Sequence, residues 1–149
     1  MIDAIDRSIL RRLQQDGRMT ATALAAEVGL TVAPCHRRLR ELESSGVVQG
    51  YRAVVDPASV GLGFQALVFV TLRDRQNMLA FEEAVVATDR VVEASRLFGE
   101  PDFLLKVIAE DLPAYQRFYD EVLVALPGVE KLTSTIVMKN LKGAGVLPL

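Results

Sequence analysis

The stretch TATALAAEVGLTVAPCHRRLRELESSG, residues 20–46, predicts two short helices joined by a glycine turn, and the interpretation of the whole chain starts from it. Thr20 is placed to cap the first helix, and Gly29 ends that helix before the second begins. Apolar residues recur at helical spacing on one face of each helix: Leu24, Ala25 and Val28 in the first, and Cys35, Leu39 and Leu42 in the second. Two short helices joined by such a turn are typical of a helix-turn-helix.

The outward face of the second helix is rich in arginine. In a helix-turn-helix the second helix enters the major groove of DNA, and a planar guanidinium can bind a phosphate or a guanine edge with two hydrogen bonds. A charge-rich helix is also typical of a face that meets only water. We predict that double-stranded DNA is bound by these residues of the segment: Thr31, Ala33, Pro34, His36, Arg37, Arg38 and Arg40.

The neighbouring residues favour a complete DNA-binding domain. Residues 2–16 predict a preceding helix, with Ile5, Ile9, Leu10 and Leu13 on its buried side and Asp6 and Arg7 facing solvent. Residues 47–55 form a β-type run with a glycine break, which predicts a strand or wing after the helices. Tyr51 and Arg52 in this run are predicted to reach the DNA backbone.

Composition places the chain among soluble globular proteins. Its 149 residues are 50% hydrophobic and 24% charged, which suits two small domains. We expect a cytoplasmic protein, because no apolar run reaches the roughly 18 residues of a membrane span and the start lacks the features of a signal peptide. The single cysteine, Cys35, cannot form an internal disulfide, and its place on an apolar helical face indicates core packing.

Charge is distributed unevenly along the chain. The net charge is −2, but residues 1–57 hold eight arginines against seven acidic residues, and residues 34–52 hold four arginines against two glutamates. The positive field is therefore local. We expect modest DNA affinity per copy, strengthened when several copies bind together.

The second half of the chain predicts an α+β domain with the order βαββαβ. Residues 57–63 are rich in Pro, Ser and Gly and indicate a linker. The predicted strands are residues 64–72, 91–98, 103–109 and 129–140, and the predicted helices are residues 78–88 and 111–126. This order is typical of a ferredoxin-like fold, an antiparallel sheet with both helices on one face. The predicted organisation is thus a helix-turn-helix domain with its following strand at 1–56, the linker, a ferredoxin-like domain at 64–142 and a tail at 143–149.

The first predicted strand indicates how the chain associates. Residues 64–72, FQALVFVTL, are apolar on both faces, whereas two helices cover only one face. The uncovered face therefore needs a partner. We predict a homodimer formed through this sheet, with about 800 Å² buried per subunit as the usual scale. Two helix-turn-helix units would then bind a pseudo-palindromic site.

Several motifs together resemble the Lrp/AsnC family of bacterial and archaeal regulators, and the resemblance covers nearly the whole chain. The matching residues include Ile5-Asp6-Arg7, Val28-Gly29-Leu30, Pro34-Cys35, Gly46-Val47-Val48, Gly50-Tyr51, Gly99, Asp102, Phe103, Leu104-Leu105-Lys106 and Leu126-Pro127-Gly128-Val129. The resemblance implies an N-terminal winged helix-turn-helix and a C-terminal ferredoxin-like domain that dimerises and binds small molecules, typically amino acids. It also implies assembly of dimers into octamers or larger particles.

The resemblance further implies an effector site between the turn after the second strand and the last strand. On this chain the corresponding residues are Leu97, Gly99, Asp102, Phe103, Thr133, Ser134 and Thr135. A glycine turn offers backbone N–H groups to a carboxylate, and Asp102 can accept from an α-ammonium. Asp102 can equally act as a cap that stabilises the turn.

Other chemistry finds little support in the sequence. The single histidine, His36, lies on the predicted DNA face, and no set of nucleophile and base can be assembled around it. Adjacent residues on a helix point about 100° apart, so Cys35 and His36 do not share a metal ion. We expect no enzyme, no cofactor and no metal.

The expected function is a sequence-specific transcription regulator tuned by an amino acid or related metabolite. Two alternatives remain: an architectural protein that wraps DNA without an effector, and a metabolite-binding module or enzyme with a vestigial helix-turn-helix.

Overall fold

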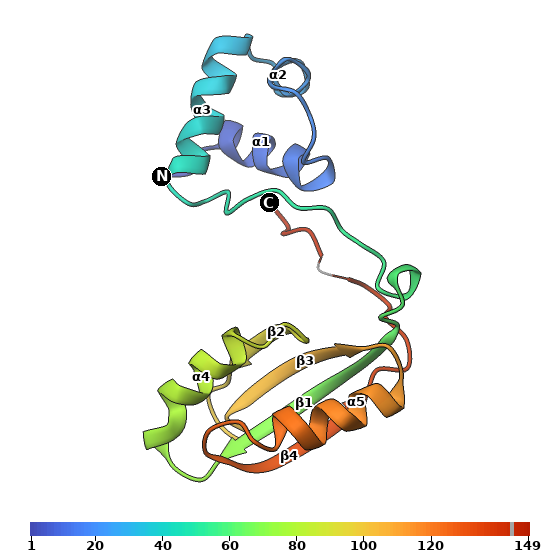
Figure 1. Ribbon diagram of the computed structural model, residues 1–149. Helices are drawn as coiled ribbons and strands as arrows, with labels where there is room; N and C mark the ends of the chain where they lie inside the picture. Colours follow the sequence, from blue (N-terminus) through green and yellow to red (C-terminus); the bar gives the residue numbers. More distant parts are fainter. Residues whose placement is uncertain (144) are drawn as a thin grey trace. The chain divides into compact units, whose positions relative to one another are not determined.

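The computed structural model describes residues 1–143 and 145–149, so Ala144 of the predicted tail lies outside the described residues. The chain divides into two compact units. The head unit holds Met1–Val54 together with Leu141–Leu149, and the sheet unit holds Val55–Asn140. Figure 1 shows three helices in the head unit and a sheet with helices in the sheet unit.

Helix α1 (Ala4–Gln15) begins at a capping box made by two acidic residues. The Asp3 carboxylate accepts from the backbone N–H of Asp6 at 2.8 Å, and the Asp6 carboxylate accepts from the backbone N–H of Asp3 at 3.1 Å. The first turn of a helix has no internal partners for its N–H groups, so this exchange fixes where α1 starts.

Helices α2 (Ala21–Val28) and α3 (Val32–Ser44) form the predicted helix-turn-helix. The Thr20 side chain accepts from the backbone N–H of Ala23, as its capping role requires. Gly29 ends α2 with φ +70°, a left-handed conformation that favours glycine because other residues carry a Cβ. The chain can therefore reverse within three residues, and α3 packs across α2 (Figure 1).

The head unit has its own apolar core, in which Ile9, Leu24 and Cys35 are completely buried. The side chains that fill the core come from all three helices: Ile9, Leu13, Leu24, Ala25, Cys35 and Leu42. Burial of the thiol raises the pKa of Cys35 and keeps it protonated. The prediction that Cys35 is a packing residue is confirmed.

Residues 47–55 form no strand, which corrects the strand predicted after the helices. The backbone N–H of Val48 donates to the carbonyl of Leu42 and closes α3, and the chain then continues without regular structure. No described segment of the chain pairs with residues 49–56. A high β-propensity gives a strand only where a neighbouring strand supplies hydrogen bonds, so the valines of this run do not suffice.

The sheet unit has the predicted βαββαβ order. Its elements are β1 (Phe64–Leu72), α4 (Met78–Val86), β2 (Val91–Arg96), β3 (Phe103–Ala109), α5 (Leu112–Phe118) and β4 (Val129–Ile136). Short helical turns lie at η1 (Ala58–Val60), η2 (Arg75–Asn77) and η3 (Tyr119–Leu123), and η3 extends α5 by one wide turn. The strand order is β2-β3-β1-β4, and all neighbours are antiparallel.

Strand β4 is shorter than the predicted 129–140. It pairs with β1 up to Ile136, which lies opposite Ala66, and the N–H of Val137 then donates to the carbonyl of Gln65. Because β1 begins at Phe64, no partner strand is left for residues further along. The length of the central strand thus sets the length of its neighbour.

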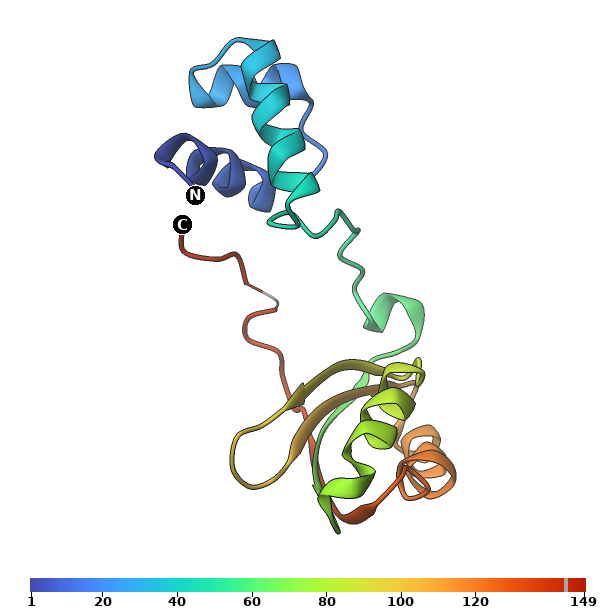
Figure 2. The ribbon, with the colours of Figure 1, turned by 90° about the vertical axis from the view of Figure 1, so that its left-hand side faces the viewer.

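Both helices cover the same face of the sheet (Figures 1 and 2). Alternate residues of β1 point toward the helices, and Ala66, Val68 and Val70 are completely buried there. The core on this side also includes Phe81 of α4 and Phe118 of α5. The opposite face, which we call the bare face, carries Leu67, Phe69, Leu104 and Ile108, all only half-buried.

A glycine substitution tests the packing of the sheet unit. Gly128 has φ +71°, and a Cβ there would lie 2.3 Å from the Cβ of Asn77. Gly61 has φ +77° but faces open space. We expect Gly61→Ala to lower the free energy of unfolding by about 1 kcal/mol through backbone strain alone. Gly128→Ala should lower the free energy of unfolding by about 1–3 kcal/mol more than Gly61→Ala does, because Asn77 must also move. Urea unfolding followed by circular dichroism measures both, and equal losses would contradict the clash.

Candidate nucleic-acid interface and small-molecule pocket

Helix α3 presents most of the predicted DNA-binding residues to solvent. Thr31, Ala33, His36, Arg37 and Arg40 are exposed, and Pro34 is half-buried. Thr31 occupies the N-cap position of α3 but makes no capping hydrogen bond with its side chain. Among the described residues, Arg37 and Arg40 form no ion pair. Their guanidinium groups are therefore available to an external anion.

Arg38 differs from its neighbours, because its guanidinium is used inside the head unit. Its Nη1 lies 2.7 Å from a carboxylate oxygen of Asp3 and 2.9 Å from one of Asp6. The backbone N–H of Asp6 and the guanidinium of Arg38 hold the pKa of Asp3 below its usual value, and the two carboxylates raise the pKa of Arg38. Arg38 thus joins α3 to the start of α1, and its guanidinium is engaged by Asp3 and Asp6 and not by solvent alone.

The same contact corrects the expectation that Asp6 faces solvent. Asp6 is buried, and its carboxylate accepts from Arg38 and from the backbone of Asp3. A buried carboxylate is tolerated when such donors replace water. The apolar pattern of α1 alone does not show this role, although an acidic residue three positions after Asp3 signals a capping box.

Tyr51 and Arg52 follow α3 in the extended segment. The Tyr51 hydroxyl donates to Glu43 of α3 at 2.8 Å. Burial and the nearby Glu43 carboxylate raise the pKa of Tyr51 to about 12, so the hydroxyl remains a donor at neutral pH. Arg52 is exposed. Tyr51 therefore holds this segment near the carboxyl end of α3, and Arg52 remains accessible.

Asp102 of the predicted effector site stabilises the turn between β2 and β3. Its carboxylate accepts from the backbone N–H of Leu72 at 2.8 Å, where the pairing of β1 with β4 shifts register. Its own N–H donates to the carbonyl of Val70, and its carbonyl accepts from the N–H of Leu97. Gly99 in this turn has φ +124°, which favours glycine. Of the two roles considered for Asp102, the structure shows the turn-stabilising one.

The remaining predicted effector residues lie on two different faces of the sheet. Phe103 is buried on the helix side, with its ring centroid 4.6 Å from that of Phe81. Ser134 is hydrogen-bonded to the hydroxyl of Tyr115, also on the helix side. Thr133 and Thr135 lie opposite Phe69 and Leu67 of β1 and share the bare face with them. The structure therefore separates Phe103 and Ser134 from the two threonines.

A pocket of about 340 Å³ lies on the bare face, next to the turn between β2 and β3. Its lining comes from β1, the turn and β4: Phe69, Thr71, Glu100, Pro101, Lys131 and Thr133. The peptide bond before Pro101 is cis. Only Thr133 belongs to the predicted set. Period-two alternation along β1 and β4 could have added Phe69, Thr71 and Lys131, because these residues share a face with Thr133.

The pocket combines the groups that bind a zwitterion. Glu100 supplies a carboxylate and Lys131 an ammonium group, while Thr71 and Thr133 supply hydroxyls that donate and accept. Phe69 supplies an apolar wall. A small molecule with one positive group, one negative group and an apolar side chain matches this lining.

The described residues show neither a metal site nor a membrane-spanning helix. In the described part of the chain, no group of three or more His, Cys, Asp and Glu residues is placed to hold a metal ion. Within the same residues, no helix has the length and apolar character needed to cross a bilayer. The single histidine, His36, lies exposed on α3 among the predicted DNA-binding residues.

Two family models match the chain. Residues 2–49 match a winged helix-turn-helix DNA-binding domain. Residues 65–147 match the Lrp/AsnC ligand binding domain. The two matches fall on either side of the linker, and each includes most of the candidate residues of its own part.

Individual proteins resemble the chain along nearly its whole length. A leucine-responsive regulatory protein of Rhizobium meliloti is 39% identical, over 96% of this chain and 93% of that protein. The DNA-binding transcriptional activator DecR of Escherichia coli is 35% identical, over 100% and 99%. The structure of a Neisseria meningitidis transcriptional regulator in complex with L-Met superposes with a TM-score of 0.93 at 35% identity, over 99% and 97%.

Proposed function

Because this chain belongs to the Lrp/AsnC family of DNA-binding transcriptional regulators, we propose that its exposed α3 arginines bind operator DNA under the control of an amino acid bound in the sheet unit. The observation that carries the proposal is the contrast along α3. Arg38 is neutralised within the fold, whereas Arg37 and Arg40 are exposed and unpaired among the described residues. The protein would act in the cytoplasm, as a regulator rather than an enzyme.

The proposed DNA interface comprises the outward face of α3 and the segment after it. Its residues are Thr31, Ala33, Pro34, His36, Arg37, Arg40, Tyr51 and Arg52. Small residues at the start of α3 permit close approach to bases, while the arginines supply two-point hydrogen bonding. With eight arginines against seven acidic residues, the first 57 residues have only a small positive excess for the phosphate contacts that supply sequence-independent binding. This balance favours operator recognition over wrapping.

The bare face supports a homodimer. Phe69 of β1 lies opposite Leu104 of β3, whereas Leu67 lies opposite Lys106 and Ile108 lies opposite Gln65. Lys106 thus lies between Leu104 and Ile108 on this face, and its ammonium group is 3.4 Å from the carboxylate of Glu93. An exposed apolar surface that also carries a paired charge is typical of a protein interface. We propose that two copies associate here, which brings two head units to one operator; larger assemblies built from such dimers, octamers included, are part of the proposal.

The pocket beside the turn supports an amino acid as effector. Lys131 would pair with the α-carboxylate, Glu100 would accept from the α-ammonium, and Phe69 would contact the side chain. In this proposal Gly99 offers backbone N–H groups, Thr135 extends the polar wall of Thr133, and Leu97 and Asp102 hold the turn in place. Phe103 and Ser134 would support the site from the helix side. The relative solved with L-Met makes methionine the first amino acid to test.

The DNA proposal is tested with a duplex that the wild-type protein selects from a random-sequence pool. Replacing Arg37 and Arg40 by Ala should lower affinity for this duplex about tenfold or more, since a bidentate base contact contributes roughly 1–3 kcal/mol. If the arginines bind phosphates instead, the salt dependence should become shallower by about 0.9 per lost contact. Fluorescence anisotropy measures both.

Arg11→Ala is the matched control, because Arg11 is an exposed arginine on α1. It should leave affinity unchanged. Unchanged affinity of the double variant would contradict the proposed interface. Wild-type protein that binds the selected and random duplexes equally would favour the architectural alternative.

The effector proposal is tested by a thermal-shift screen of the twenty amino acids, beginning with L-methionine. A ligand at a hundredfold excess over its Kd stabilises the folded state by about 2.7 kcal/mol, which raises the melting temperature measurably. Lys131→Ala should abolish that rise, whereas Lys139→Ala, beyond the end of β4, should retain it. A flat screen, or a rise that survives Lys131→Ala, would contradict the pocket.

The dimer proposal is tested by light scattering coupled to size-exclusion chromatography. Leu67→Lys places a second ammonium group directly opposite Lys106 on the bare face and should shift the protein toward monomer, because like charges repel and burying an unpaired charge is costly. Leu79→Lys is the control, since Leu79 is an exposed leucine of α4, on the other side of the sheet. A wild-type protein that elutes as a monomer would overturn the proposal.

A further inference from the structure

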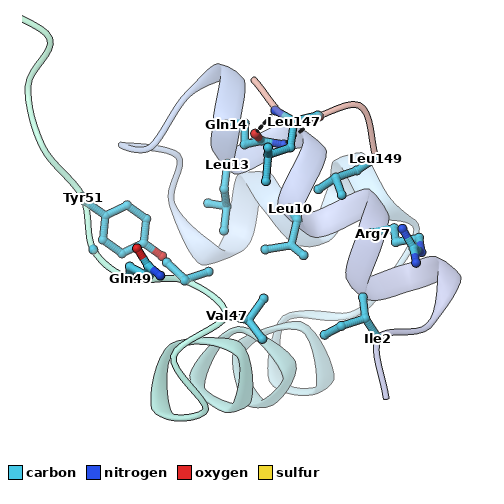
Figure 3. Close-up of a pocket in the computed structure, with 12 residues that line it drawn as sticks. Ile2, Arg7, Leu10, Leu13, Gln14, Val47, Gln49, Tyr51, Leu147 and Leu149 are labelled. Atoms are coloured by element: carbon cyan, nitrogen blue, oxygen red, sulfur yellow. Dashed lines mark hydrogen bonds between the residues drawn. The ribbon is translucent and has the colours of Figure 1, made fainter. Parts of the chain in front are cut away.

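The head unit contains an apolar groove that the proposed function does not use. It has a volume of about 450 Å³ and lies between α1 and the segment after α3 (Figure 3). Its walls are mostly aliphatic: Ile2, Leu10 and Leu13 on one side, and Val47 and Val48 on the other. Of the residues of the proposed DNA interface, Tyr51 borders the groove at one end, and none of those on α3 lines it.

The end of the described chain forms part of the wall of this groove. Residues 145–149, which we call the tail segment, belong to the head unit, and Leu147 and Leu149 line the groove. Figure 3 shows Leu149 beside Leu10 of α1. Leu149 is half-buried, whereas the Leu147 side chain remains 66% exposed. Leu149 is therefore the apolar anchor, and Leu147 is held in a different way.

Gln14 holds Leu147 through its backbone. The N–H of Leu147 donates to Oε1 of Gln14 at 2.6 Å, and Nε2 of Gln14 donates to the carbonyl of Leu147 at 3.3 Å (Figure 3). A side-chain amide has the same donor and acceptor as a peptide unit, so Gln14 pairs with this residue as a neighbouring strand would. Two hydrogen bonds to one residue set both its position and its direction.

The tail segment also has a shape suited to docking. The N–H of Leu149 donates to the carbonyl of Leu147 at 3.0 Å, which closes a tight turn around Pro148. Proline restricts the backbone before docking, and less conformational entropy is lost when the turn binds. The turn directs the side chain of Leu149 into the groove.

We propose that the groove on α1 is a docking site for Leu147-Pro148-Leu149 of the same chain, with Gln14 as the clamp and Leu149 as the anchor. The chain leaves the head unit at Val54 and returns to it at Leu141. A short tether gives a docked segment a millimolar effective concentration, so even a weak contact is populated. Docking adds a fourth segment to the three helices and stabilises α1 against local unfolding.

The direct test is amide hydrogen exchange of Leu147, followed by NMR in the full chain without DNA or amino acid. The N–H of Leu147 should be protected in the wild type and exchange about tenfold faster in Gln14→Ala, since two neutral hydrogen bonds together contribute on the order of 1–2 kcal/mol. Gln15→Ala, which changes an exposed glutamine next to the clamp, should leave the rate unchanged. Wild-type exchange at the rate of an unstructured peptide would overturn the proposal.

Thermal unfolding of the head unit provides a second, independent measurement. Leu149→Asp should lower the melting temperature by several degrees, and Leu141→Asp, at a leucine that is 87% exposed, should not. Combining Gln14→Ala with Leu149→Asp should lower it no further than the larger single effect, because both remove the same docking event. Additive losses would contradict a shared site. Protection of Leu147 that disappears on dilution would assign the groove to a second copy and overturn docking within the chain.

Discussion

Strand β1 is apolar on both faces, and the polypeptide supplies helices for only one of them. The covered face, with Val68 and Val70 completely buried, forms the core against α4 and α5. The bare face leaves Leu67 and Phe69 half-exposed in the centre of the sheet. The association that we propose through this face would follow from this imbalance, and the small-molecule pocket lies at the end of the same face. A ligand in the pocket would contact the strand through which we propose that two copies associate, which would give it a physical route to influence assembly.

The three arginines of α3 differ in their surroundings: one is paired within the fold, and two are exposed. Arg38 donates to the carboxylates of Asp3 and Asp6, which lie close together because both belong to the capping box of α1. Arg37 and Arg40 lie on the side that has no acidic neighbour within hydrogen-bonding distance among the described residues. The start of α1 thus does two things: it sets the first residue of the helix and it removes one arginine from the charge available to DNA. The remaining positive charge is small, which favours the proposed binding of DNA through paired head units.

Regular elements were predictable from the sequence because their signals are local. Helical spacing located α1, α2 and α3, and the apolar runs located all four strands in the correct order. The predictions were wrong where the local structure or the exposure of a residue depends on a residue distant in the sequence. Residues 49–56 have the composition of a strand but no partner, and Asp6 looked solvent-exposed until Arg38 was placed beside it. The pocket shows the same limit, because Glu100 and Lys131 approach only after the turn and β4 meet beside β1. Contacts such as that of Gln14 with Leu147, 133 residues apart, have no local signal at all.

The division of the chain has a consequence for protein synthesis. The head unit is discontinuous, since residues 1–54 are joined in it by residues 141–149. During translation the three helices are made early, and the residues that complete the groove on α1 are added only after the entire sheet unit has been synthesised. Until then Leu10 and Leu13 line a groove that lacks Leu149. The nascent head therefore carries an uncovered aliphatic surface until residues 141–149 are added, and the final state of the first unit made depends on residues that follow the sheet unit.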